Sequence, residues 1–298
     1  MRHGIADLDG PVHYLDFGGT GPPLLMVHGL GGAALNWMGI GPEVARTHHA
    51  IAVDLAGFGS TPLFDRSAAV GANADLVHAF IEKVVGGPVV LMGNSMGGHI
   101  AILEAAIHPA WVRALILVDP AVPGMKVRRP DPVMVGIVAA LSIPGLAQNL
   151  IEWQAKRAGV ERLVHETLAL VCADPSRVDP ALVEAHVKLT EERAHLGRQS
   201  SRAFLQASRS IALRMADPRF WRRVAAVAAP TLVVHGSLDR LIPVGAARDL
   251  VARRPDWQIR VLDGVGHVPM MEVPAMLMDA VNEWAPYAGA ATHQGVVT

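Results

Sequence analysis

The 298-residue sequence contains a single cysteine, Cys172, and few aromatic or charged residues. One cysteine excludes an intrachain disulfide and is consistent with a reducing compartment, and we expect Cys172 to be a small buried side chain. Aromatic residues make up 5% and charged residues 18% of the chain, whereas hydrophobic residues make up 51%. This balance excludes a disordered chain and predicts one large domain, or a core with an inserted lobe.

The sequence also lacks a surplus of charge, metal-binding motifs and phosphate-binding loops. The formal net charge is −1 and no cluster of Lys and Arg occurs, so nucleic acid is not expected as a partner. The 14 histidines include no HExxH motif, and a lone cysteine excludes CxxC, so no metal is expected. Neither GxGxxG nor GxxxxGKS/T occurs, which argues against a nucleotide-binding domain, and we expect no cofactor.

Long hydrophobic runs are absent as well. Residues 1–19 lack a basic start followed by an apolar stretch, so a signal peptide is not expected and the cytoplasm is the default location. The most apolar window, residues 133–146, contains Pro144 and is too short to cross about 30 Å of hydrocarbon. The sequence therefore predicts no stable membrane insertion.

Short apolar runs alternate with helical patterns through much of the chain. This alternation is typical of a largely parallel sheet covered by helices. The runs suit strands that are buried on both faces, and they lie at residues 24–27, 50–55, 89–92, 114–118, 230–234 and 258–262. Helices are predicted at residues 75–85, 96–107, 245–253 and 274–284.

The region between the fourth and fifth runs has a different pattern. Residues 123–215 show little alternation of the β type, and the stretches 150–171 and 181–195 have helical character. We predict a helical lobe at 123–215 inserted into a sheet domain formed by residues 1–122 and 216–287. The tail, 288–298, has no apolar periodicity and is expected to be frayed.

Ser95 lies in Gly93-Asn94-Ser95-Met96-Gly97, between a predicted strand and a predicted helix. A strand that turns sharply into a helix places the serine in a strained backbone and lifts its hydroxyl clear of the sheet. Flanking glycines remove the Cβ clashes that such a bend would create. The placement predicts that Ser95 is a nucleophile.

A serine nucleophile needs a histidine that accepts its proton and a carboxylate that orients the histidine. Asp239 and His267 each follow a predicted strand, and they come after Ser95 in the order Ser, acid, His. The carboxyl ends of parallel strands share one edge of a sheet, so the three side chains are expected to converge. Asp119 is an alternative acid, and His235 and His28 are alternative bases with positions that better suit the shaping of a turn.

The negative oxygen that develops during attack on a carbonyl needs hydrogen-bond donors already in place. Two backbone N–H groups are candidates for this oxyanion hole, those of Met96, directly after the serine, and Leu30, in His28-Gly29-Leu30-Gly31-Gly32.

Taken together, these segments resemble the α/β-hydrolase family. The resemblance is carried by the His28-Gly29 loop, DLAGFGS at 54–60, the GNSMGG elbow, GSLDRLIP around Asp239 and GVGHVPMMEVP around His267. It implies an α/β-hydrolase fold: an eight-stranded, mostly parallel sheet flanked by helices, an inserted helical cap, and a triad of Ser95, Asp239 and His267. Serine at position 95 is unlike the epoxide hydrolase and haloalkane dehalogenase branches, which carry an aspartate there.

The elbow is similar to that of carbon–carbon bond hydrolases of aromatic ring-cleavage pathways. Those enzymes tend to have a tryptophan after the catalytic histidine, where this chain has Val268. The candidate substrate contacts are Met134 in the cap, Trp37 and Val268, and packing into the core is the alternative for each.

The first functional hypothesis is a serine esterase whose small-molecule substrate carries a moderately apolar acyl group. The second is a carbon–carbon bond hydrolase acting on a ring-cleavage diketo acid, with Arg202 or Arg209 as a carboxylate clamp. The third is a non-catalytic receptor for a small apolar ligand. The sequence leaves the oligomeric state open, a homo-oligomer included.

Overall fold

A computed structural model describes residues 1–123, 159–193 and 196–293 of the chain. Its centre is one eight-stranded sheet with the strand order β1-β2-β4-β3-β5-β6-β7-β8. Strands β3 to β8 run parallel to one another, whereas β2 is antiparallel to both β1 and β4. The strands are β1 (Arg2–Asp7), β2 (Pro11–Gly18), β3 (Pro23–Val27), β4 (His49–Val53), β5 (Val89–Asn94), β6 (Val112–Val118), β7 (Thr231–Gly236) and β8 (Gln258–Leu262).

The apolar runs in the sequence predicted the six parallel strands, β3 to β8, but not β1 and β2. The parallel strands are apolar because helices cover them on both faces. Strand β1 is largely exposed and β2 is only partly buried, so neither forms a continuous apolar run. The mostly parallel, eight-stranded sheet implied by the family resemblance is confirmed.

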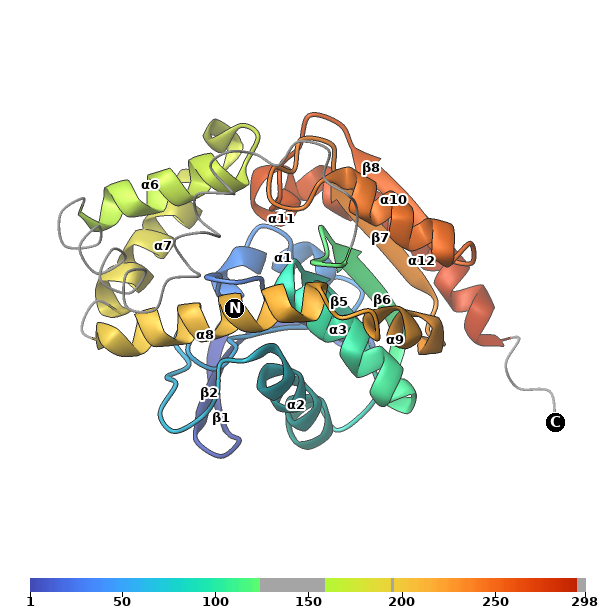
Figure 1. The fold of residues 1–298 in the computed structure, drawn as a ribbon, viewed down its shortest axis with the longest axis horizontal. Helices are drawn as coiled ribbons and strands as arrows, with labels where there is room; N and C mark the ends of the chain where they lie inside the picture. The colour runs from blue at the N-terminus through green and yellow to red at the C-terminus, as the bar shows by residue number, and fades with distance from the viewer. Residues whose placement is uncertain (124–158, 194–195, 294–298) are drawn as a thin grey trace.

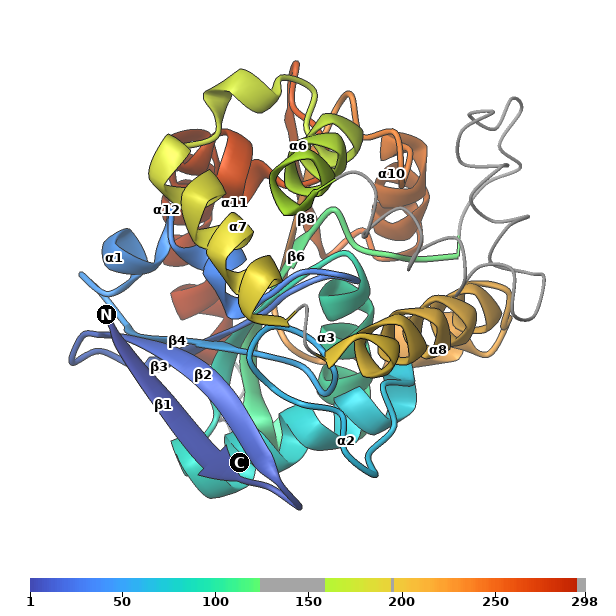
Figure 2. The same ribbon diagram turned by 90° about the vertical axis from the view of Figure 1, so that its left-hand side faces the viewer.

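Helices cover both faces of the sheet (Figure 2). One face packs against α2 (Val70–Phe80), α3 (Met96–Ile107) and α10 (Val244–Arg253), and the other against α1 (Gly41–Val44) and α12 (Pro274–His293). Each face has its own apolar cluster, with Phe80 and Ile100 in the first and Trp37 and Trp284 in the second. The remaining elements are η1 (Ala34–Trp37), η2 (Ile81–Val85), η3 (Pro109–Trp111), α6 (Val160–Val171), η4 (Pro175–Arg177), α7 (Pro180–Arg193), α8 (Arg198–Met215), α9 (Phe220–Ala226) and α11 (Pro269–Glu272).

The described part of the predicted lobe is helical. Helices α6 and α7 lie together, and α8 runs past them across the molecule (Figure 1). Ala203 and Ala207 of α8 are buried in the first cluster, and Leu168 of α6 and Leu182 of α7 are buried in the second. Residues 124–158, which include Met134 and the apolar window, lie outside the described residues, so the domain boundaries stay a prediction.

Several boundaries differ from the sequence-based expectation. Helix α2 begins at Val70 rather than Asp75, and its continuation η2 has the wider turns of a π-helix. Helix α12 extends to His293, into the tail that was expected to be frayed. A helix gains one backbone hydrogen bond for each added residue, so it can outlast the apolar pattern that identified it. None of the described helices combines the length and hydrophobicity needed to span a membrane.

Candidate active site

Ser95 occupies the sharp turn between β5 and α3. Its backbone is left-handed, with φ +52° and ψ −116°, and its N–H donates to the Val118 carbonyl at 3.0 Å. Such a conformation costs a non-glycine residue about 1–3 kcal/mol. The neighbouring glycines make it feasible, because a Cβ on Gly93 would lie 2.4 Å from the Gly97 carbonyl oxygen and one on Gly97 would lie 2.2 Å from that of Val27.

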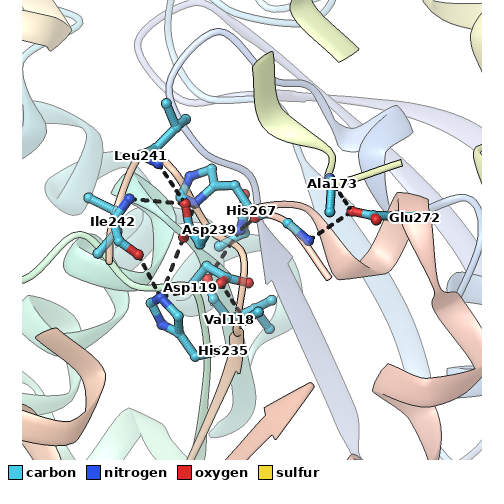
Figure 3. A network of polar contacts seen from close by, with 12 residues as sticks. Val118, Asp119, Ala173, His235, Asp239, Leu241, Ile242, His267 and Glu272 are labelled. Atoms are coloured by element: carbon cyan, nitrogen blue, oxygen red, sulfur yellow. Dashed lines mark hydrogen bonds and ion pairs between the residues drawn. The ribbon is translucent and has the colours of Figure 1, made fainter. Parts of the chain in front are cut away.

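His267 and Asp239 meet at the carboxyl ends of β8 and β7 (Figure 3). The Nδ1 atom of His267 lies 2.6 Å from Oδ2 of Asp239, and both residues are buried. The other carboxylate oxygen accepts the backbone N–H groups of Leu241 and Ile242 at 2.8 and 3.0 Å. The backbone of His267 is held in turn by a 2.7 Å hydrogen bond from its N–H to the carbonyl of Val171.

The electrostatics of this pair keep the carboxylate ionised. Burial by itself would raise the pKa of Asp239, but the charge of His267 and the hydrogen bonds from His235 and His267 outweigh it and hold that pKa below its usual range. An ionised Asp239 accepts the Nδ1–H of His267, so Nε2 is the ring nitrogen left to take a proton.

Asn94 connects the serine turn to the histidine loop. Its side-chain amide donates to the carbonyls of Val118 and His267, both at 3.1 Å. Across the described segments no hydrogen bond joins the Ser95 hydroxyl to His267. The amide bridge nevertheless fixes the two loops side by side, and such side-chain contacts commonly tighten only when substrate binds.

The candidate oxyanion donors flank the serine. A Cβ on Gly29 would lie 2.9 Å from the Cβ of Ser95, so the loop carrying Leu30 runs directly against the nucleophile candidate. Met96 begins α3, where the first N–H groups have no partner within the helix. Both candidate donors therefore lie beside Ser95.

The buried carboxylate of Asp54 helps to hold the loop that carries Leu30. Asp54 accepts the backbone N–H groups of Ala34 and Ser60 at 2.6 and 2.8 Å, and its other contact is His13 Nδ1 at 2.7 Å. Phe204 of α8 packs over Gly31, 3.3 Å from where a Cβ would be. The loop is thus held by both the sheet domain and a helix of the predicted lobe.

The profile of the alpha/beta hydrolase family matches residues 24–280. The chain belongs to the alpha/beta hydrolase family.

The proteins similar to this hydrolase include hydrolases of different kinds. It is 30% identical over 260 residues to 2-hydroxy-6-oxo-6-(2'-aminophenyl)hexa-2,4-dienoic acid hydrolase of Metapseudomonas resinovorans, covering 86% of this chain and 81% of the relative. A solved serine hydrolase involved in carbazole degradation has 25% identity and a TM-score of 0.73, covering 96% of this chain and 99% of that one. A thermophilic esterase from Thermogutta terrifontis has 24% identity and a TM-score of 0.71, covering 97% and 99%, and it shows a shared fold.

In the part of the chain that the structure describes, no hydrogen bond or ion pair joins Asp119, the alternative acid, to His267. Asp119 is fully buried, and its Oδ1 accepts the N–H of Gly236 at 2.9 Å. Burial raises the pKa of Asp119 well above its usual value. The structure therefore gives Asp239 the contact that an orienting carboxylate needs.

The two alternative bases, His235 and His28, make other contacts. His235 lies on the far side of Asp239 from His267, with Nε2 2.7 Å from the carbonyl of Ile242 (Figure 3). His28 uses both ring nitrogens, since Nδ1 donates to the Gly29 carbonyl at 2.7 Å and Nε2 accepts the N–H of Leu55 at 3.1 Å. These contacts suit residues that shape the site.

The three predicted substrate contacts have different outcomes. Met134 lies outside the described residues, and Trp37 and Val268 are buried in the second apolar cluster, Trp37 completely. Their roles in substrate binding stay predictions, and core packing, the alternative, accounts for both placements. Cys172 is buried as expected, and burial together with the nearby Glu272 and Asp174 carboxylates raises its pKa to about 12, so its thiol is unreactive.

Two further residues of the site, Asn94 and Glu272, were not predicted from the sequence. The Glu272 carboxylate is buried and accepts the N–H groups of Ala173, Asp174 and Gly266 at 3.1, 3.0 and 2.9 Å. The signal in the sequence was the position of Glu272 in the apolar stretch Met270-Met271-Glu272-Val273. A carboxylate in such a stretch is expected to be buried, and a buried carboxylate needs hydrogen bonds. Both residues hold the histidine loop in place.

Proposed function

We propose that the chain is a serine hydrolase that cleaves carboxylic esters with a moderately apolar acyl group. The observation that carries the proposal is the 2.6 Å contact between His267 Nδ1 and Asp239 Oδ2, on a loop tied by Asn94 to the strained turn at Ser95. In this arrangement Asp239 orients His267, His267 is the base and Ser95 is the nucleophile.

The reaction proceeds through an acyl-enzyme. The Ser95 hydroxyl attacks the ester carbonyl while Nε2 of His267 takes its proton, and the resulting oxyanion accepts hydrogen bonds from the N–H groups of Leu30 and Met96. Collapse breaks the carbon–oxygen bond, and His267 returns the proton to the departing alcohol. Water activated by His267 then attacks acyl-Ser95, which releases the carboxylic acid and restores the serine.

The second candidate is hydrolysis of a carbon–carbon bond in a ring-cleavage diketo acid. It is favoured by the 30% identity to the dienoic acid hydrolase of Metapseudomonas resinovorans. Two observations weigh against it: Val268 stands where such enzymes tend to have tryptophan, and Arg202 and Arg209, the candidate carboxylate clamps, are exposed. The half-buried Arg193 is not a candidate clamp, because it already donates to the carbonyls of Gly57 and Gly59.

A fluorophosphonate probe tests the shared part of both candidates. We expect labelling of the wild type and none of Ser95→Ala. If neither protein is labelled, the chain is a receptor rather than an enzyme, and if both are labelled, Ser95 is not the nucleophile.

A substrate panel separates the two candidates. Nitrophenyl esters of increasing acyl length are compared with a ring-cleavage dienoate, and the proposal expects turnover of the esters, with an optimum above acetyl. Exclusive turnover of the dienoate would replace the ester assignment with the second candidate.

The role of His267 is tested on the best substrate of that panel. We expect His267→Ala to lower kcat/KM by several orders of magnitude with little change in the melting temperature, because it removes a proton shuttle. His165→Ala, at an exposed position on α6, is the matched control and should retain full activity. Equal turnover in the His267 variant contradicts the base assignment.

A further inference from the structure

Two histidines and a glutamate meet at the outer ends of α2 and α3, away from the serine. Nδ1 of His78 on α2 lies 2.9 Å from Oε1 of Glu104 on α3, and the rings of His78 and His108 stack with centroids 3.6 Å apart and an interplanar angle of 13°. One ligand-type atom from each of the three residues lies within 4.8 Å of the others. The stack and the contact bring three potential metal ligands to one point.

The local backbone explains why these side chains converge. Glu104 and His108 are four residues apart, so they lie on the same side of the last turn of α3, and the His108 N–H donates to the Glu104 carbonyl at 2.8 Å. Helices α2 and α3 pack side by side (Figure 1), which brings His78 against this turn. No motif in the sequence predicts this cluster, because one ligand comes from a different helix.

The burial, hydrogen bonding and charge of these three side chains suit the binding of a cation. The Glu104 side chain is buried, whereas both histidines are only partly buried and can be reached by solvent. Within residues 1–123, 159–193 and 196–293, neither ring nitrogen of His108 makes a hydrogen bond. The exposed Asp75 on α2 lies one turn before His78 and adds negative charge nearby.

We propose that His78, Glu104 and His108 form a binding site for one Zn²⁺ ion, with water as the fourth ligand. Zn²⁺ takes imidazole nitrogen and carboxylate oxygen at about 2.0–2.2 Å, and tetrahedral angles at those lengths separate neighbouring ligand atoms by about 3.3 Å. The 2.9 Å contact is shorter than that separation, and the three ligand atoms lie within 4.8 Å of one another. Side-chain rotations that also part the two stacked rings would complete the site. The bound ion displaces the proton shared by His78 and Glu104.

This site is separate from the proposed catalytic centre. Ser95 precedes the first turn of α3 and His108 follows the last, a distance of about 20 Å at the helical rise per residue. The ion would link α2 to the end of α3, and a ligand that binds the folded state alone raises its stability. Its role is to brace one face of the sheet.

The experiment uses untagged, full-length protein freed of metal with a chelator. Zn²⁺ is titrated by calorimetry and melting temperatures are measured with and without the ion, and Co²⁺ is used as a spectroscopic probe of tetrahedral geometry. We expect one ion per chain, a rise in melting temperature, and the intense visible absorption of tetrahedral Co²⁺. Absence of binding to the wild type overturns the proposal.

Single variants identify the ligands. His78→Gln and His108→Gln should each weaken Zn²⁺ binding at least tenfold and abolish the Co²⁺ absorption, and melting without metal verifies that they fold. His3→Gln is the matched control, because His3 and His13 form another close histidine pair, with Nδ1 and Nε2 2.9 Å apart. Binding that survives both α2 and α3 variants, or that is lost in His3→Gln instead, overturns the assignment.

Discussion

At the scale of single residues, the function of each histidine depends on what its ring nitrogens contact. His267 donates to a carboxylate and keeps Nε2 available, whereas His28 has both nitrogens engaged with the backbone. His99 is buried on α3, where Nδ1 donates to the Ala121 carbonyl at 2.8 Å and the ring stacks on Phe220. The same residue type therefore serves as a candidate base, a turn former and a core residue.

Buried His99 makes stability dependent on pH. Burial lowers the pKa of His99 to about 4 in the folded protein, whereas an unfolded histidine has a pKa of about 6.5. Between these values the unfolded chain binds a proton that the folded chain does not, so the free energy of unfolding falls as the pH drops below 6.5. From pH 7 to pH 5 the expected loss is about 2 kcal/mol from this residue.

Urea unfolding at pH 7, 6 and 5 measures this effect. His99→Gln removes the titrating group, so its unfolding free energy should fall less steeply with acidification than that of the wild type, although it starts lower at pH 7. His165→Gln on the surface is the control and should follow the wild-type slope. Parallel slopes for His99→Gln and wild type would show that His99 does not contribute.

At the scale of elements, the turn at Ser95 was predictable because its requirements are local. A buried strand, small neighbours and a following helix are all visible in residues 89–107. The strands β1 and β2 were missed because their pairing is decided by the antiparallel partner and not by an apolar run. Helices α8 and α9 were not predicted as separate elements.

The small residue at position 97 is a requirement of the close approach of α3 to β3. A Cβ there would lie 2.2 Å from the Val27 carbonyl oxygen and 2.6 Å from that of His28. We expect Gly97→Ala to lower the unfolding free energy by about 1–3 kcal/mol, as overpacking does, and to reduce turnover by displacing Ser95.

The control for this substitution is Gly87→Ala. No atom lies within 4 Å of its Cβ position, so its unfolding free energy should stay the same or rise by up to about 1 kcal/mol. Denaturant midpoints of the two variants measure the contrast, and equal midpoints would contradict a steric role for Gly97.

At the scale of the whole molecule, the site depends on segments that are far apart in sequence. Glu272 joins the loop after α6 to the loop that carries His267, through the N–H groups of Ala173, Asp174 and Gly266 (Figure 3). Asn94 joins that same histidine loop to the serine turn. The histidine is therefore positioned by contacts from three parts of the chain.

We expect Glu272→Gln to lower both stability and kcat. The amide nitrogen of glutamine would face N–H donors, and one unsatisfied buried group costs about 1–3 kcal/mol. Because Gly266 directly precedes His267, kcat should fall more than KM rises. Kinetics and thermal unfolding measure both effects, and Glu283→Gln, at an exposed position on α12, is the control. An unchanged kcat in a destabilised Glu272→Gln would assign Glu272 a structural role only.

The sequence by itself determined the parallel core, the position of the serine turn and the order of the serine, acid and histidine segments. These features follow from apolar runs and from glycines at a bend, which are properties of neighbouring residues. Only the tertiary structure decided that Asp239 rather than Asp119 contacts His267, that Asn94 and Glu272 hold the histidine loop, and that His78 meets Glu104 and His108. Those pairings depend on the packing of loops and helices against one another, and no local pattern encodes the distances that such packing produces.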